Sequence, residues 1–207
     1  MDFVEDIMTK KVVTCTPTDT ILEVRNRIIN HRITRIVVVD AKNKPVGIIT
    51  QKDIVNFLLA DKSKRGLEKR QAKEVMSKDL VTVNPTAPIS NVAKTMIKKK
   101  ISSLVVVDDD DKLRGIATKA DISMYFAGKK AGIYRVSDFM TSNPITIRPS
   151  HPIFLAVSLM SEHNISRVVV TNEEDKPVGI ITLTDVTMIS NLLLSLIHIS
   201  EPTRQAE

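Results

Sequence analysis

The chain has 207 residues, of which 43% are apolar and 26% charged, and its formal net charge is +6. This composition excludes a disordered or collagen-like chain and is typical of a globular protein of one or two domains. The single cysteine, Cys15, excludes a disulfide framework and a zinc site of clustered cysteines, which suits a reducing cytoplasm.

The expected elements follow an internal repeat. The segments VEDIMTKKVVTCTPTDTI, AKEVMSKDLVTVNPTAPI and VSDFMTSNPITIRPSHPI align without a gap on Met8, Met76 and Met140. In each copy the threonine of a later T-x-x-D motif lies 42 positions after this methionine. The length differences therefore fall between the copies, and a fixed period of this kind indicates repeated structural units.

Each copy is expected to fold as β-α-β-β-α. In the first copy, residues 12–16 are β-branched and predict a strand, and the apolar spacing from Ile21 to Ile29 predicts a helix capped near Thr20. Residues 36–39 and 46–49 predict two buried strands joined by a hairpin turn, and a second helix begins after Thr50.

One glycine per copy occupies the same position in the third predicted strand: Gly47, Gly115 and Gly179. A glycine inside a strand predicts a bulge or the close approach of another part of the chain. A copy of about 60 residues buries little surface alone, so we expect neighbouring copies to pair.

We therefore divide the chain into six segments. They are repeat 1 (1–60), a basic linker (61–72), repeat 2 (73–127), a second linker (128–135), repeat 3 (136–193) and a tail (194–207). The tail begins with the sequence LSLIHISEPTR (194–204), which matches the translation of a transposase adapter used in sequencing libraries. We expect residues 194–207 to be an artefact of sequencing, and a partner for repeat 3 to lie beyond the point where the natural frame is cut.

The order of DIMT, VVTCTP, ITRIVVVD and VGIITQKDI, repeated three times, resembles the cystathionine β-synthase (CBS) domain family. The resemblance implies an α/β (α+β) fold of tandem CBS repeats, paired into a Bateman module whose inter-repeat clefts bind AMP, ADP, ATP or S-adenosylmethionine. It also implies a regulatory protein and not an enzyme, with an adenine nucleotide as regulatory ligand and no catalytic cofactor.

The T-x-x-D motifs lie where a strand is expected to pass into a helix. One interpretation is a capping box, in which the threonine and aspartate satisfy backbone groups at the helix start. The other is a nucleotide site, because a carboxylate can accept the hydrogen bonds of a ribose diol and a helix start attracts phosphate. By resemblance the ribose candidates are Asp53, Asp121 and Asp185, and the phosphate candidates are Thr50, Thr118 and Thr182.

A cation is expected beside the phosphate. Arg35 and Arg167 share one position before the second strand, and a guanidinium suits bidentate phosphate binding. The alternative is a surface ion pair. Repeat 2 has Ser103 at this position, which leaves its own site in doubt. The adenine slot needs apolar walls, for which Val12, Val13, Ile33 and Ile49 are weaker candidates, since each also suits the core.

Other charged segments carry less specific signals. The basic stretch DKSKRGLEKRQAK lacks interleaved aromatic residues, so a solvated linker helix is favoured over a nucleic-acid interface. The acidic run 108–111 lacks the spacing of a calcium loop and predicts a hairpin turn, and no metal site or catalytic constellation is expected.

The sequence therefore predicts a cytoplasmic sensor of an adenosine-derived small molecule. We expect a homodimer that signals to a downstream protein or a missing C-terminal domain, with no membrane partner. A scaffold with vestigial clefts is the alternative, and a nucleic-acid module is a weaker one.

Overall fold

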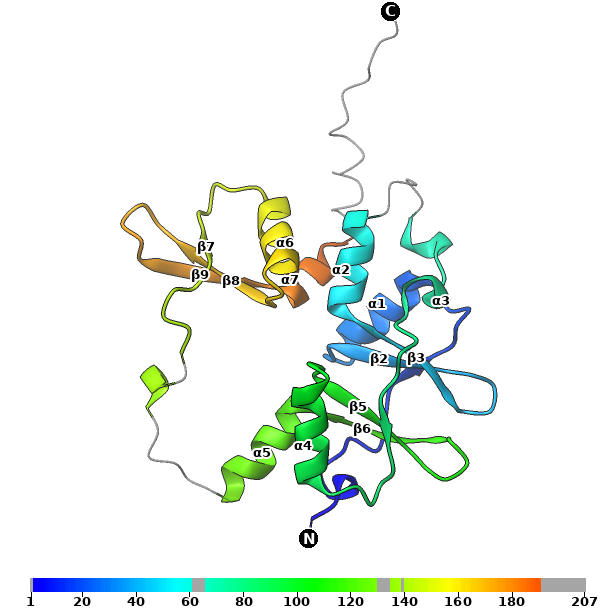
Figure 1. Ribbon diagram of the computed structural model, residues 1–207. Coiled ribbons are helices and arrows are strands. Elements are labelled where there is room, and N and C mark those ends of the chain that lie inside the picture. The colour runs from blue at the N-terminus through cyan, green and yellow to red at the C-terminus, as the bar shows by residue number, and fades with distance from the viewer. Residues whose placement is uncertain (1, 61–65, 130–134, 139, 191–207) are drawn as a thin grey trace, which may run out of the picture. The chain divides into compact units, whose positions relative to one another are not determined.

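The computed structural model describes residues 2–60, 66–129, 135–138 and 140–190 (Figure 1). The adapter-like tail, residues 194–207, lies outside the described residues, as do residues 61–65 and 130–134 of the two linkers. Within the described ranges no helix is long and apolar enough to cross a membrane.

The three repeats share the predicted order of elements (Figure 1). Repeat 1 contains β1 (Thr14–Cys15), α1 (Ile21–Asn30), β2 (Arg35–Val39), β3 (Pro45–Thr50) and α2 (Gln51–Ala60). Repeat 2 contains β4 (Thr82–Val83), α4 (Ile89–Lys98), β5 (Ser103–Val107), β6 (Leu113–Thr118) and α5 (Lys119–Lys129). Repeat 3 contains β7 (Thr146–Ile147), α6 (Ile153–Glu162), β8 (Arg167–Thr171), β9 (Pro177–Thr182) and α7 (Leu183–Met188). The mixed α/β class and the β-α-β-β-α repeat are thus confirmed.

Each repeat builds a three-stranded sheet with its middle strand in the centre, in the orders β1-β2-β3, β4-β5-β6 and β7-β8-β9. The first strand pairs parallel with the second, and in repeats 2 and 3 the second pairs antiparallel with the third through the predicted hairpin. The hairpin turns place Asn43, Asp111 and Asp175 at equivalent left-handed positions, with φ of 61°, 62° and 59°. Asparagine and aspartate tolerate this conformation better than most residues, which explains their place in the turn.

Short helices precede the first strand of every repeat, and the sequence did not predict them. They are η1 (Val4–Asp6), η2 (Leu67–Lys69), α3 (Ala72–Val75) and η3 (Val136–Asp138). In the described part of the basic linker, η2 and α3 replace the expected single solvated helix. Leu67 is only 1% exposed there, so this part of the linker is anchored to the core of its unit.

The chain divides into two compact units that cut across repeat 1. Unit 1 comprises residues 1–18, 36–49 and 76–140, which hold most of the first sheet and the strands and helices of repeat 2 from β4 to α5. Unit 2 comprises residues 19–35, 50–75 and 141–207, which hold α1, α2, α3 and the sheet and helices of repeat 3.

In unit 1 the sheets of repeats 1 and 2 pack against each other. Val37 and Val39 of β2 share a buried cluster with Val105 and Val107 of β5 and with Ile116 of β6. Burying these β-branched side chains removes the apolar face of each sheet from water, which is the main stabilising term for so small a repeat. The predicted pairing of repeats 1 and 2 therefore includes direct contact between their sheets.

Each of these two repeats also receives a segment from the other, which we call an arm. Arm 1 (residues 2–9) lies on repeat 2: Val4 N donates to Ala87 O at 2.9 Å, and Thr9 and Ile116 exchange backbone hydrogen bonds of 2.9 and 3.1 Å. Arm 2 (residues 70–77) makes the equivalent contacts with repeat 1. Ala72 N donates to Asp19 O at 2.8 Å, and Ile48 and Ser77 bond at 2.9 and 3.0 Å.

The strand glycines accept the methionine of the opposite arm. A Cβ built on Gly115 would lie 2.4 Å from Met8 Sδ, and one on Gly47 would lie 2.5 Å from Met76 Sδ. The close approach predicted for these glycines is confirmed, because any side chain here would displace the methionine. A Cβ built on Gly179 would lie 3.8 Å from Val170 Cβ, which is ordinary contact.

In unit 2 the helices of repeat 1 pack against those of repeat 3. Val55 of α2 joins a buried cluster with Val157 and Met160 of α6 and Val186 of α7. Arg25 of α1 reaches the end of α7, where it donates to the carbonyl oxygen of Thr187 at 2.9 Å and to Ser190 Oγ at 2.8 Å, and it also contacts Met188 O. A cation at the carboxyl end of a helix opposes the helix dipole favourably.

Candidate functional site

The T-x-x-D motifs form the same turn three times, at the junction of a strand and a helix. In repeat 1 the carboxylate oxygen Asp53 Oδ2 accepts from Thr50 N at 2.8 Å and from Thr50 Oγ1 at 2.7 Å, while Asp53 N donates to Thr50 Oγ1 at 3.2 Å. The corresponding distances are 2.7, 2.7 and 3.4 Å for Thr118 and Asp121 and 2.8, 2.7 and 3.4 Å for Thr182 and Asp185. These hydrogen bonds satisfy backbone groups at the helix start, as the capping-box interpretation predicts.

The cap leaves part of each aspartate unused. Within the described residues, every hydrogen bond to these carboxylates ends on Oδ2 and none ends on Oδ1. A carboxylate oxygen has room for about two hydrogen bonds. The turn can therefore hold its helix start and still offer an acceptor to a ligand, so the two sequence interpretations do not exclude each other.

The threonine hydroxyls are committed to the cap. Each hydroxyl donates its hydrogen to the aspartate and accepts from a backbone N–H. The placement of these hydroxyls near a phosphate remains a prediction. In the structure each hydroxyl orients the aspartate of its own turn.

The candidate cations lie across the strand pair from these turns. Arg167 of β8 is the register partner of Thr182 at the end of β9, and Ser103 of β5 is the partner of Thr118 in repeat 2. In repeat 1, Gln51 N donates to Thr34 O at 3.0 Å, which places Arg35 next to the equivalent turn. Arg35 Nε lies 3.3 Å from Thr34 Oγ1. Each repeat thus brings the cation position and the T-x-x-D turn to the same end of its sheet.

The four adenine candidates are less clearly placed. Val12 and Val13 are half-buried and Ile49 is fully buried, and these three belong to unit 1. Ile33 is half-buried and belongs to unit 2. Full burial of Ile49 fits a core role, and the contact of all four with a ligand remains a prediction.

The turns of repeats 1 and 3 touch each other, which sequence reasoning missed. Gln51, the residue after Thr50, is only 6% exposed, and its Oε1 accepts from Thr184 Oγ1 of the repeat 3 turn at 3.3 Å. Lys52 also contacts Asn164 Oδ1. No local pattern signals a contact between positions 51 and 184, because it depends on the packing of α2 against α7.

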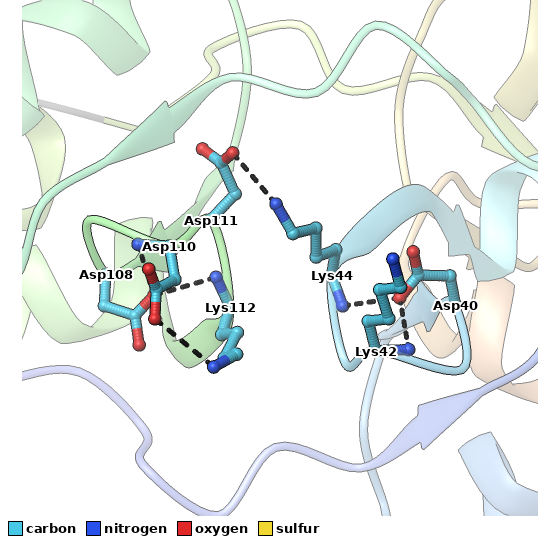
Figure 2. Close-up of polar contacts among 7 residues, drawn as sticks. All are labelled: Asp40, Lys42, Lys44, Asp108, Asp110, Asp111 and Lys112. Carbon is cyan, nitrogen blue, oxygen red and sulfur yellow. Dashed lines mark hydrogen bonds and ion pairs between the residues drawn. The ribbon is translucent and has the colours of Figure 1, made fainter.

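The acidic run of repeat 2 forms the predicted hairpin turn (Figure 2). Asp108 Oδ1 accepts from the backbone N–H groups of Asp110 at 3.1 Å and Lys112 at 2.9 Å, and Asp40 Oδ1 accepts likewise in repeat 1. The pKa of Asp40 lies below its usual value because the backbone N–H of Lys44 stabilises the carboxylate. Among the described residues, no group of three or more histidine, cysteine or acidic side chains could hold a metal ion.

A family model described as "CBS domain" matches this chain three times, over residues 4–60, 72–128 and 136–190. The L-aspartate semialdehyde sulfurtransferase of Methanocaldococcus jannaschii is 36% identical over 127 residues, which are 61% of this chain and 24% of that protein. The chain thus spans about a quarter of this curated relative.

Two solved structures resemble the chain. The protein MJ1225 of Methanocaldococcus jannaschii has 27% sequence identity and a TM-score of 0.83, covering 96% of this chain and 76% of that one. The CBS domain pair of protein MJ0100, solved with 5-methylthioadenosine and S-adenosyl-L-methionine, has 35% identity and a TM-score of 0.57. It covers 63% of this chain and 99% of that one.

Proposed function

Because the chain belongs to the CBS domain family, we propose that it is a regulatory protein that senses an adenosine derivative. The observation that carries this proposal is the repeated turn in which aspartate Oδ2 caps a helix while Oδ1 remains available. A carboxylate in that state suits a ribose diol, which offers two hydroxyl donors. The adenosine ligands of the MJ0100 domain pair support the same ligand class.

We further propose that repeats 1 and 3 hold the working sites. Both have an arginine beside the turn, whereas repeat 2 has Ser103 there. In this proposal Asp53 and Asp185 accept from the ribose, and Arg35 and Arg167 bind phosphate in a bidentate manner. Thr50 and Thr182 orient the aspartates. Asp121 and Thr118 keep the capping role alone.

The contact between Gln51 and Thr184 supports communication between these two sites. A ligand that draws Asp185 toward its ribose also moves the turn that holds Thr184, and the buried Gln51 is bonded to that hydroxyl. A sensor requires that the ligand bind one arrangement better than another. The cytoplasmic location, the homodimer and the downstream partner remain predictions of the sequence.

The test is a thermal-shift and calorimetric panel of AMP, ADP, ATP, S-adenosylmethionine and 5-methylthioadenosine. Arg35→Gln and Arg167→Gln should weaken AMP at least ~10-fold but leave methylthioadenosine unchanged, because the latter has no phosphate. Asp53→Ala and Asp185→Ala should weaken both ligands. If no ligand on the panel binds the intact chain, the alternative of a scaffold with vestigial sites replaces this proposal.

A further inference from the structure

A cavity of about 350 Å³ lies in unit 1, where arm 1 crosses repeat 2. Its wall consists of three charged and three apolar side chains, which are Glu5, Lys10, Arg114, Met8, Pro85 and Leu113. The volume is at the lower end of the range for small-molecule pockets. The cavity adjoins the first two residues of β6, whereas the T-x-x-D turn of repeat 2 begins at Thr118, the last residue of that strand. The cavity therefore does not include the candidate nucleotide turn.

Backbone hydrogen bonds hold this wall in place. Glu5 N donates to Pro85 O at 3.2 Å, which fixes arm 1 against the turn after β4. The pair of backbone bonds between arm 1 and β6 brings Lys10, the first residue after arm 1, alongside that strand. On the opposite side, Leu113 N donates to Asn43 O at 3.0 Å. The fold therefore forms the cavity without a ligand.

The apolar part of the wall is anchored in two packed clusters. Met8 packs against the buried cluster of repeat 2 that contains Val4 and Met96, and its sulfur fills the space beside Gly115. Leu113 packs against the cluster between the sheets of repeats 1 and 2. Both side chains are only half-buried, so each also presents apolar surface to the cavity. This surface suits the methylene groups of a ligand.

The charged part of the wall has no partner among the described residues. There, none of Glu5, Lys10 and Arg114 makes a hydrogen bond or an ion pair through its side chain. The next acid of arm 1 differs, because Asp6 Oδ2 accepts from Phe3 N at 2.9 Å. The cavity thus presents two cations and one anion whose hydrogen-bonding groups are available to a ligand.

From this wall we propose that the cavity binds an acidic α-amino acid, glutamate or aspartate. Such a ligand carries two carboxylates and one ammonium, which complement two cations and one anion. Arg114 and Lys10 each bind one carboxylate, and Glu5 accepts hydrogen bonds from the ammonium. The methylene groups lie on Met8 and Leu113. This site goes beyond the proposed nucleotide function and does not depend on it.

The pattern of charges favours this ligand class over other small ions. Phosphate, or a dicarboxylate without an amine, brings negative charge to the cavity and leaves Glu5 unpaired beside it. A neutral amino acid leaves one of the two cations unpaired. The opposite arm and strand do not repeat the pattern, because the sequence has Lys73 at the position equivalent to Glu5 and Val46 at the position equivalent to Arg114. The equivalent positions thus supply natural substitutions for a test.

Calorimetric titration of glutamate and aspartate into the full chain tests the proposal. The unmodified chain should bind at least one of them, and Arg114→Val and Glu5→Lys should each weaken that binding at least ~10-fold, because each removes a charge-assisted contact. Both substitutions introduce the residue found at the equivalent position, so both variants should fold, which circular dichroism checks. The matched control is Lys11→Val, since this exposed lysine lies next to Lys10 but outside the wall. It should bind as the unmodified chain does.

A second titration tests the contact with the ammonium. Glutarate is glutamate without the amine, so it should bind the unmodified chain more weakly than glutamate, and Glu5→Gln should largely remove this difference. AMP binding should be unchanged in Arg114→Val, and glutamate binding unchanged in Asp53→Ala/Asp185→Ala, so this proposal and the nucleotide proposal fail independently. The proposal is overturned if neither amino acid binds, if binding survives both Arg114→Val and Glu5→Lys, or if glutarate or inorganic phosphate binds as tightly as glutamate.

Discussion

Substituting the three strand glycines by alanine should have different effects on stability, although they occupy the same sequence position. Met8 Sδ would lie 2.4 Å from a new Cβ at residue 115, and Met76 Sδ would lie 2.5 Å from one at residue 47. A new Cβ at residue 179 would lie 3.8 Å from Val170 Cβ, the nearest atom among the described residues. None of these glycines has a positive φ, so the backbone itself accepts alanine at all three sites.

The magnitude follows from two opposing terms. Alanine in place of glycine stabilises by about 0.4–1 kcal/mol where it fits, because it reduces the entropy of the unfolded chain. Overpacking costs about 1–3 kcal/mol where neighbours must move. Gly47→Ala and Gly115→Ala should therefore lower the free energy of unfolding by about 1–2 kcal/mol. Gly179→Ala should leave it unchanged or raise it by up to about 1 kcal/mol.

The assay is thermal and urea unfolding of the three variants, each compared with the unmodified chain at the same protein concentration. For a chain of this size about 1 kcal/mol corresponds to a shift in Tm of about 2–4 °C. Gly115→Ala should melt below the parent and Gly179→Ala at or above it. If Gly115→Ala and Gly179→Ala changed stability equally, the arm exchange between repeats 1 and 2 would be refuted.

Four further predictions concern single contacts. Arg25→Met should destabilise unit 2 by about 1–3 kcal/mol, because it leaves the buried Ser190 hydroxyl and the end of α7 without their charged donor. Urea unfolding measures this loss, and an unchanged midpoint of the unfolding transition would argue against the contact. Lys44→Ala should change stability by less than about 1 kcal/mol, since the partner Asp111 is 77% exposed, and a larger loss would show that the pair is not a surface ion pair. The hairpin hydrogen bonds lower the pKa of Asp40, so the stability they confer is complete above the ordinary aspartate pKa and disappears as the pH falls through the lowered value; Asp40→Asn should remove this part of the acid dependence of Tm. Ser103→Arg should strengthen AMP binding to repeat 2 in calorimetry, and no gain would remove the arginine from the proposed site.

The sequence predicted the features that depend on neighbours along the chain. The T-x-x-D turn is closed by residues three positions apart, so Thr50 and Asp53 identify their own cap. The hairpins and the helix after Thr20 are likewise local, and Thr20 accepts from Glu23 N as expected of a capping residue. The strand predicted over residues 12–16 is shorter in the structure, at Thr14–Cys15, because only these residues pair with β2.

The structural features that the sequence did not predict depend on segments that are far apart along the chain. The glycine position alone signalled a close approach but not that the approaching group is a methionine from the other repeat. The contact of Gln51 with Thr184 and the reach of Arg25 to Thr187 join residues more than a hundred positions apart. No periodicity records such pairs, because the packing of whole helices and not a local motif brings them together.

Calorimetric titration of AMP into the full chain tests the central claim most directly. We predict binding to the unmodified chain and its loss in Asp53→Ala/Asp185→Ala. The control is Asp121→Ala, which removes the same helix cap in repeat 2 and should lower the free energy of unfolding by a similar amount, about 1 kcal/mol. This control should bind AMP as the unmodified chain does. Equal binding by the double variant and the control, with both folded, would contradict the assignment of the ribose to these turns.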